Sequence, residues 1–177
     1  MPFIDDFSCR TLVFYLKKKF EAFDEFVEFK ALTKKECGHY VKVIRSNRGG
    51  EYTFNKFVNF CSQNGIKKEI IDSYTPQQNG VAKRKKMTIV EMARSLVKTN
   101  ELPTEYWQEA IATVEYLINW CPTKLVLDKI PLKAWSRNRW TIEQLRVFEF
   151  IAYAHVPQEQ RQQLDEKGIK SIFTSDV

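Results

Sequence analysis

Two positions near the middle of the chain combine a spacing and a local context that could support phosphoryl transfer. Asn47 follows the strand-like run Tyr40–Arg45, Lys83 lies near the start of a predicted helix, and residues 48–82, 35 in number, separate them. Two Mg²⁺ ions about 3.5–4 Å apart can hold the attacking and leaving oxygens of a phosphodiester. Mg²⁺ prefers hard oxygen ligands, usually carboxylates. Such a site needs an Asp at the strand end and a Glu on a facing helix.

Neither position provides a carboxylate. Asn47 offers one neutral carbonyl oxygen, and the Lys83 ammonium has three donors and no acceptor, so it would repel a metal ion. Glu51 is the one acid left in the loop after the strand. Glu91 lies roughly 80° around the helix from Lys83, which makes it a poor replacement. The sequence therefore predicts no metal ligands here, and a nuclease that uses other acids stays open as an alternative.

The elements that must position these residues are read from hydrophobic periodicity and turn residues. The adjacent acids Asp5 and Asp6 fit turn and strand-edge chemistry better than a metal pair, because adjacent strand residues point to opposite faces. The expected elements are a hairpin of Pro2–Phe7 and Thr11–Leu16, a helix within Lys17–Lys35 ended by Gly38, strands Tyr40–Arg45 and Ile66–Ile71, helices Thr53–Asn64, Gly80–Thr99 and Pro103–Trp120, and a loop over Asp72–Asn79.

Two of the predicted helices have distinct faces. In the first, Phe20, Phe23, Phe26, Val27, Phe29 and Leu32 are expected to form the core side. In the helix Gly80–Thr99 the expected core residues are Val81, Thr88, Val90, Met92 and Leu96. Its polar face carries Lys83, Arg84, Lys85, Lys86, Arg94 and Lys98. Four cations in a first helical turn would oppose the positive end of the helix dipole but would favour phosphate contact.

Four segments resemble a known family in one register. IRSNRGGEY resembles the motif R-S-D-x-G-G-E-Y, and YTPQQNGVAKRKKMTIVEMARSL resembles Y-T-P-Q-Q-N-G-V-A-E-R-K-N-R-T-I-V-E-M-A-R. IDDFSCR and LPTEYWQEAIATVEYLINWCPTK resemble two further segments in the same order, and the resemblance covers Pro2 to about Ala154. The family is the integrase catalytic core, of the DDE strand-transferase type, of copia-type LTR retrotransposon Pol polyproteins.

The resemblance implies an α/β, ribonuclease H-like fold with sheet order 3-2-1-4-5. In the family the first catalytic Asp lies on a strand upstream of I-D-D-F-S-R, so this chain is expected to lack the first, central strand. Residues 1–122 are then an N-terminally truncated catalytic core, 123–144 a linker, and 145–177 the truncated start of an SH3-like module. Asn47 stands at the place of the second catalytic Asp and Lys83 at that of the Glu. Expected DNA contacts are Arg48, Gln78, Asn79, Arg84, Lys85 and Lys86.

Composition is compatible with this interpretation without requiring it. The net charge of +6 and pI of about 9.1 allow a nucleic-acid partner. The sequence has four cysteines, none in a C-x-x-C pair, and only two histidines, so a zinc site is not expected. We expect reduced thiols of an intracellular protein at Cys9, Cys37, Cys61 and Cys121. No apolar run is long enough for a membrane span.

The functional expectation is a retrotransposon integrase-like domain whose ancestral role is metal-dependent DNA strand transfer, in a copy that is catalytically dead. Mg²⁺ is the family's metal, and no cofactor is expected in this copy. The alternative is a non-enzymatic module retained by the host for DNA binding or for association with integrase subunits. Expected partners are DNA and integrase-like subunits, without a membrane or a small-molecule substrate, and the expected location is intracellular, nuclear if the protein is functional.

Overall fold

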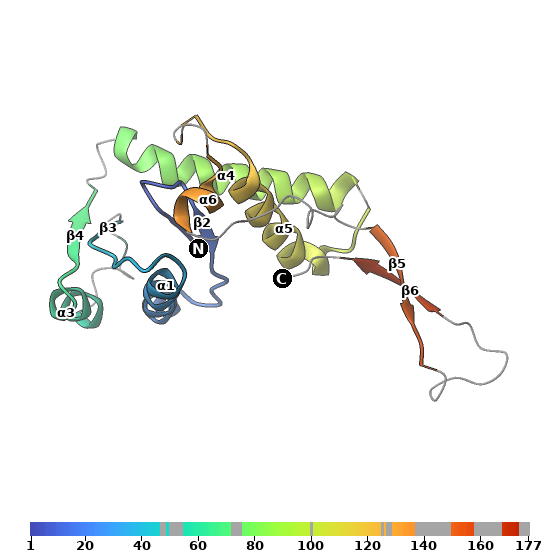
Figure 1. Cartoon of the computed structure of the whole chain (residues 1–177), viewed down its shortest axis with the longest axis horizontal. Coiled ribbons are helices and arrows are strands. Elements are labelled where there is room, and N and C mark those ends of the chain that lie inside the picture. Colours follow the sequence, from blue (N-terminus) through green and yellow to red (C-terminus); the bar gives the residue numbers. More distant parts are fainter. Residues whose placement is uncertain are drawn as a thin grey trace.

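The computed structural model describes residues 1–46, 49, 55–71, 76–99, 101–124, 126, 129–136, 150–157 and 168–173. Of these, residues 76–79, 150–155 and 168–173 are described by their backbone. Helices and short strands mix along the chain (Figure 1), with α4 on one side of the first strands and α1 and α3 on the other. None of the described helices combines the length and apolarity that a membrane crossing requires.

The predicted N-terminal hairpin is confirmed. Strand β1 (Pro2–Ile4) pairs antiparallel with β2 (Thr11–Val13), with Phe3 opposite Leu12. The Asp5 carboxylate closes the connecting turn, because it accepts hydrogen bonds at 2.7 Å from both the backbone N–H and the hydroxyl of Ser8. Asp5 therefore acts as a turn residue, as its position predicts.

The outer edge of β2 is covered by a helix instead of a strand. Helix α5 (Trp107–Trp120) follows the short 3-10 helix η2 (Thr104–Tyr106) and presents Glu115 and Asn119 to β2. The Asn119 amide accepts from the Thr11 N–H at 2.9 Å and donates to the Thr11 carbonyl at 2.7 Å, as a neighbouring peptide group would. Glu115 accepts from the Val13 N–H at 3.0 Å. Two α5 side chains four residues apart thus bind the backbone of two β2 residues that are two apart.

A second, parallel pair of strands carries the middle of the chain. Strand β3 (Val43–Ser46) pairs with β4 (Lys67–Ile70), and helix α3 (Asn55–Gln63) lies between them in sequence. These elements confirm the predicted order, with shorter strands than expected. The β1–β2 and β3–β4 pairs are separate two-stranded sheets.

Helix α1 (Ala22–Cys37) follows the 3-10 helix η1 (Lys19–Glu21) and ends, as predicted, at Gly38, whose φ of +73° suits glycine. Phe26 is 1% exposed. The expected core role of Phe20 and Val27 is wrong: Phe20 is 67% exposed because it lies in η1, where the helical repeat of α1 has not begun. Val27 is exposed because it lies about 100° around the helix from Phe26.

Helix α4 (Pro76–Thr99) starts four residues earlier than predicted and absorbs the end of the expected loop. Proline suits the first turn of a helix, since its missing N–H would have no partner there. The buried side of α4 is formed by Ile89, Ala93 and Val97, spaced by four residues. Val81, Thr88 and Met92, which the sequence placed in the core, are exposed, whereas Val90 and Leu96 are half-buried.

The described core consists of two hydrophobic clusters. One joins α4 and α5 and includes Val13 of β2 at its margin. The other joins α1, α3 and β3 and includes Phe3 of β1 at its margin. The hairpin therefore contributes to both. Helix α6 (Pro131–Trp135) docks on α1, where the Trp135 indole N–H donates to Glu36 at 2.8 Å.

The last described elements form an antiparallel hairpin of β5 (Phe150–His155) and β6 (Gly168–Phe173), which extends away from the helices in Figure 1. A pair of strands after residue 145 agrees with the expectation of strands in this region. Two strands do not establish an SH3-like module.

Candidate nucleic-acid interface

The predicted site residues fall into two groups. Asn47, Arg48 and Glu51 lie outside the described residues, and Gln78 and Asn79 are placed by their backbone in the first turn of α4. Lys83, Arg84, Lys85 and Lys86 are all described. The candidate site is therefore built here from the basic turn of α4 and from the strands beside it.

The basic turn, Lys83–Lys86, lies about two turns inside α4 and not at its start. Lys83, Arg84 and Lys86 are exposed, and Lys85 is half-buried. The expected conflict with the helix dipole is wrong, because the dipole acts mainly within the first turn. The four cations are thus compatible with a stable helix and remain available to an anionic partner.

Arg84 is held close to the helix backbone. Its guanidinium lies over Gly80, one turn earlier, so that a Cβ at Gly80 would lie 2.9 Å from the Nη1 atom of Arg84. Glycine at position 80 therefore leaves room for this position of the guanidinium.

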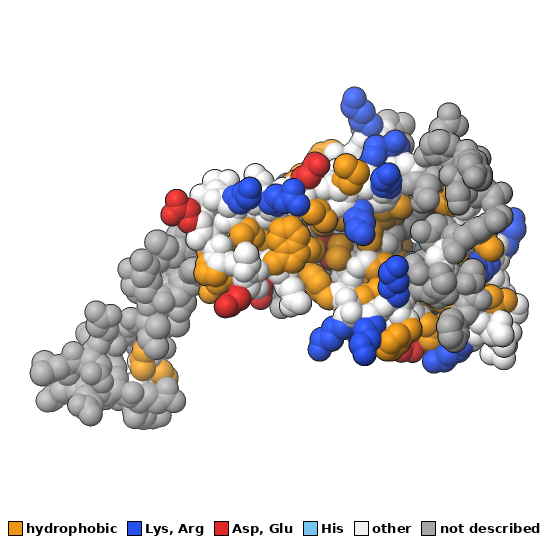
Figure 2. Space-filling model, turned by 180° about the vertical axis from the view of Figure 1, so that it is seen from behind, with side chains coloured by type: hydrophobic (Ala, Val, Ile, Leu, Met, Phe, Trp, Pro, Cys, Tyr) orange, Lys and Arg blue, Asp and Glu red, His pale blue; other side chains and the backbone are white. Residues whose placement is uncertain are grey.

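Further cations extend the basic surface along the same helix. Arg94 and Lys98 are exposed, and with Lys83 they lie within about 60° of arc on α4, along roughly 22 Å of its length. On the face of the molecule shown in Figure 2, Lys and Arg side chains outnumber Asp and Glu. A row of cations of this length could follow several phosphates of a nucleic-acid backbone.

The basic turn also lies close to the start of β1. Burial lowers the pKa of the Met1 amino group, and the positive charge of Lys86 lowers it further, while Glu25 and Glu115 act in the opposite direction. The Met1 amine donates to the Phe14 carbonyl. Two cations thus lie within electrostatic reach of each other where α4 packs on β1.

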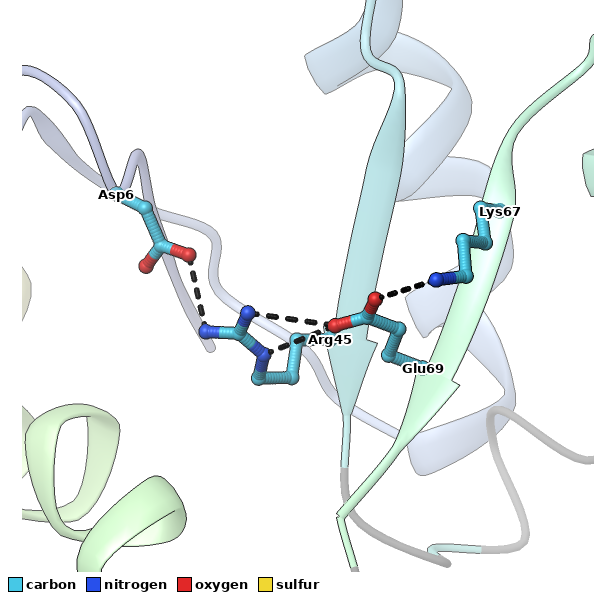
Figure 3. A network of polar contacts seen from close by, with 4 residues as sticks. All are labelled: Asp6, Arg45, Lys67 and Glu69. Carbon is cyan, nitrogen blue, oxygen red and sulfur yellow. Dashed lines mark hydrogen bonds and ion pairs between the residues drawn. The ribbon is translucent and has the colours of Figure 1, made fainter.

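A network of ion pairs connects the hairpin to the β3–β4 pair (Figure 3). Arg45, two residues before Asn47, binds Asp6 at 3.0 Å and Glu69 at 3.3 Å, and Lys67 binds Glu69 at 2.9 Å. Hydrogen bonds from Lys67 and then from Arg45 lower the pKa of Glu69. Sequence reasoning missed this network, because the pairing of Arg45 with Glu69 depends on strand register. Arg45 is neutralised by two carboxylates and is a weaker candidate for phosphate contact than the basic turn.

The described residues contain no group of three or more His, Cys, Asp and Glu side chains that could hold a metal ion. The four cysteines are free thiols, of which Cys9, Cys37 and Cys61 are buried. Within the described ranges, the chemistry that the structure offers at this site is therefore positive charge and hydrogen-bond donors.

Comparison with known proteins places the chain. No family model matches it. It is 44% identical over 173 residues to the retrovirus-related Pol polyprotein from transposon TNT 1-94 of Nicotiana tabacum. The aligned segment covers 98% of this chain and 13% of that protein. The chain belongs to the copia-type retrotransposon Pol family. The Pol polyprotein from transposon RE2 of Arabidopsis thaliana is 30% identical over 171 residues, covering 97% of this chain and 12% of that protein.

Solved structures show which part of a Pol protein this copia-type chain resembles. A chain of the simian T-cell lymphotropic virus intasome, in complex with a PP2A regulatory subunit, matches 97% of this chain and 60% of its own length with a TM-score of 0.62 and 17% identity. The HTLV-2 integrase catalytic core, in complex with magnesium, matches 75% of this chain and 80% of its own length with a TM-score of 0.57 and 19% identity. The fold is that of the ribonuclease H-like integrase catalytic core.

Proposed function

We propose that this chain is an integrase-like domain that binds DNA through α4 and does not catalyse strand transfer. The observation that carries the proposal is the exposed basic turn, Lys83–Lys86, on a fold shared with integrase catalytic cores. The chain spans about an eighth of the length of the curated Pol relatives, so the activities of those whole proteins are not assigned to it.

DNA contact would be largely independent of base sequence. Lysine acts as a point charge toward phosphate, whereas the guanidinium of Arg84 can offer two parallel N–H donors to one phosphate group. Arg48, Gln78 and Asn79 are proposed to add contacts from the loop after β3 and from the first turn of α4. Contacts of this kind position a protein on a duplex but carry no direct sequence information.

The lack of catalysis follows from the residue types at the two family positions. Asn47 and Lys83 replace the second Asp and the Glu that would bind magnesium, and an ammonium group repels the ion. Magnesium in such a site would neutralise the phosphate and activate the attacking oxygen. The side chains present do not fit that ion, and no step is assigned to it.

The division of the chain into domains is also part of this proposal. We place the catalytic core at residues 1–122, a linker at 123–144 and the start of an SH3-like module at 145–177. Phe3 of β1 and Ile44 of β3 pack in the same core cluster, although the two strands belong to separate sheets. Among the described residues, no strand lies between them.

A role in subunit association remains the alternative. The HTLV-2 catalytic core has been solved in trimeric and dimeric forms. A chain with the same fold could associate with integrase subunits without binding DNA itself. In either role, a functional copy would act in the nucleus.

DNA binding is tested by removing the basic turn. The triple variant Lys83→Gln, Arg84→Gln, Lys86→Gln should bind a labelled duplex of about 20 base pairs roughly 10- to 1,000-fold more weakly at low salt. The slope of log affinity against log salt should fall by up to about three, since each lost phosphate contact contributes about 0.9. Fluorescence anisotropy across a salt series measures both quantities.

The matched control removes the same charge elsewhere. Lys17, Lys19 and Lys35 are exposed and lie on or near η1 and α1, and their triple change to Gln should leave affinity within about threefold of the native chain. Equal losses in the two triple variants would mean that net charge, and not α4, determines binding. Undetectable binding by the native chain at low salt would favour the subunit-association role.

Catalysis is tested by restoring the two carboxylates. The native chain and the double variant Asn47→Asp, Lys83→Glu should both lack Mg²⁺-dependent cleavage and strand transfer, because none of residues 1–177 is assigned the role of the family's first catalytic Asp. A gel assay with labelled DNA ends, with and without Mg²⁺, measures this. Activity of the native chain would support a nuclease that uses other acids. Activity of the double variant alone would show that the first Asp is not needed.

A further inference from the structure

Gly80 occupies a place in α4 where the backbone does not require glycine. It is the fifth residue of the helix, and its φ lies outside the left-handed region. Gly38 and Gly65 differ, because their φ angles of +73° and +64° favour glycine. Inside a helix, glycine is less favourable than alanine, since it loses more conformational freedom on folding. The backbone conformation therefore does not account for glycine at position 80.

The contacts around Gly80 account for it. A Cβ at Gly80 would lie 2.9 Å from Nη1, 3.3 Å from Cζ and 3.4 Å from Nη2, and all three atoms belong to Arg84. Side chains on a helix lean toward its N-terminus, so residue 84 reaches back over residue 80, four positions earlier. The guanidinium consequently occupies space that any other side chain at position 80 would begin to fill.

Arg84 is available to an anion in this position. It is exposed, and it forms no ion pair with an acid in the part of the chain that the structure describes, whereas Arg45 binds both Asp6 and Glu69. A guanidinium binds phosphate through two parallel N–H donors, so its contribution depends on orientation more than that of an ammonium group does. A guanidinium that is already oriented also loses less freedom when phosphate binds.

We infer that Gly80 is a positioning residue of the DNA-binding surface: because it has no side chain, the Arg84 guanidinium lies against α4 in the position from which it binds a phosphate. The inference rests on the proposed binding of DNA by α4 and deepens it. Gly80 acts through Arg84 and is assigned no contact of its own with DNA. The helix is less stable at position 80 as a result, and Arg84 is oriented before DNA binds.

Gly80→Ala tests this inference, because it should change stability and binding in opposite directions. Alanine is the better helix former, so the equilibrium constant for unfolding, measured in urea, should fall about two- to fivefold. The added Cβ displaces the guanidinium, so affinity for the labelled duplex should fall about two- to tenfold, the range for ordering one long side chain on binding. The charge of Arg84 remains, so the slope of log affinity against log salt should not change. A folding defect would instead lower stability and affinity together.

A double-mutant cycle assigns the effect to Arg84. Arg84→Gln alone should weaken binding and lower the salt slope by about 0.9, since one phosphate contact is lost. In the Arg84→Gln background, Gly80→Ala should change affinity by less than about twofold, because the two residues act through one interaction. A loss of the same size with and without Arg84 would mean that the glycine acts through backbone flexibility, and the inference would be wrong.

The orientation of the guanidinium is also measured without DNA. In NMR relaxation measurements on the full chain, the Arg84 Nε–H group should show the restricted motion of an ordered side chain, and Gly80→Ala should increase that motion. Arg94, which is exposed further along α4, is the internal control and should not change. Equal motion of the Arg84 Nε–H group in the native chain and in Gly80→Ala would contradict the inference.

Ser95→Ala is the matched control for helix stability. Ser95 is exposed on α4, and alanine is the better helix former there too. This variant should stabilise the helix and leave DNA affinity within about twofold of the native value, as a surface substitution away from Arg84. An equal loss of affinity in Ser95→Ala and Gly80→Ala would show that helix stability, and not Arg84, determines binding.

The two proposals can be distinguished when they fail. Undetectable DNA binding by the native chain at low salt would overturn the proposed function and this inference with it. Binding by the native chain that Gly80→Ala leaves unchanged would overturn this inference alone.

Discussion

At the scale of single residues, Glu115 shows how a buried acid can serve a structural role. Burial raises the pKa of Glu115 to about 7, although the Val13 N–H, Arg10 and the N-terminal amine all favour its charged form. The ordinary value for Glu is about 4.3. Because the folded chain holds the proton more tightly than the unfolded chain, this residue contributes stability that is full below about pH 4.3 and is lost as pH rises toward 7.

Glu115→Gln should remove this pH dependence while keeping an acceptor for the Val13 N–H. The free energy of unfolding of the native chain, measured in urea, should fall relative to that of the variant between about pH 4.5 and 7. The slope of this difference should be at most about 1.4 kcal/mol per pH unit. Glu105→Gln, at an exposed position on η2, is the control and should follow the native chain. Identical pH profiles for native chain and Glu115→Gln would show that Glu115 titrates as an ordinary carboxyl.

At the scale of elements, periodicity and turn residues predicted the order of helices and strands correctly, because each element has its own local signal. The start of α4 was missed because Asp72–Asn79 contains residues typical of turns, whereas Pro76 also suits a first helical turn. The buried face of α4 was missed because α5 packs on Ile89, Ala93 and Val97, and the identity of a packing partner is not visible in the repeat.

Contacts between elements could not be predicted from local pattern. Asn119 and Thr11 are 108 residues apart, and nothing in either segment indicates that a helix amide completes a strand edge. The basic run Lys83–Lys86 could be identified from the sequence because a run of charges is local. Its position two turns inside α4 could not, because that position depends on where the helix begins. Asn47 and Arg48 lie outside the described residues, so their predicted roles stay predictions.

At the scale of the whole molecule, the division of the described core into two clusters has a consequence for unfolding. The α1–α3–β3 cluster and the α4–α5 cluster are joined through the hairpin, which contributes Phe3 to one and Val13 to the other, and through α6, which packs on α5 and binds Glu36 of α1. The strands β1 and β3 belong to separate sheets, and the exposed ion pair between Arg45 of β3 and Asp6 of the hairpin turn contributes little, since such pairs are worth about 0–1 kcal/mol. Weak coupling of this kind favours opening of one cluster without the other.

Two cavity-forming variants should therefore affect different halves of the chain. Phe26→Ala removes a nearly fully buried ring and should cost about 3–5 kcal/mol, and Ile89→Ala should cost about 2–5 kcal/mol. In native-state amide exchange, Phe26→Ala should raise exchange most in α1, α3, β3 and β4, and Ile89→Ala should do so in α4 and α5. The β1–β2 hairpin should respond to both, because it packs on both clusters. Uniform acceleration across all elements by either variant would mean that the chain unfolds as one unit, and the two clusters would then be coupled more strongly than their contacts indicate.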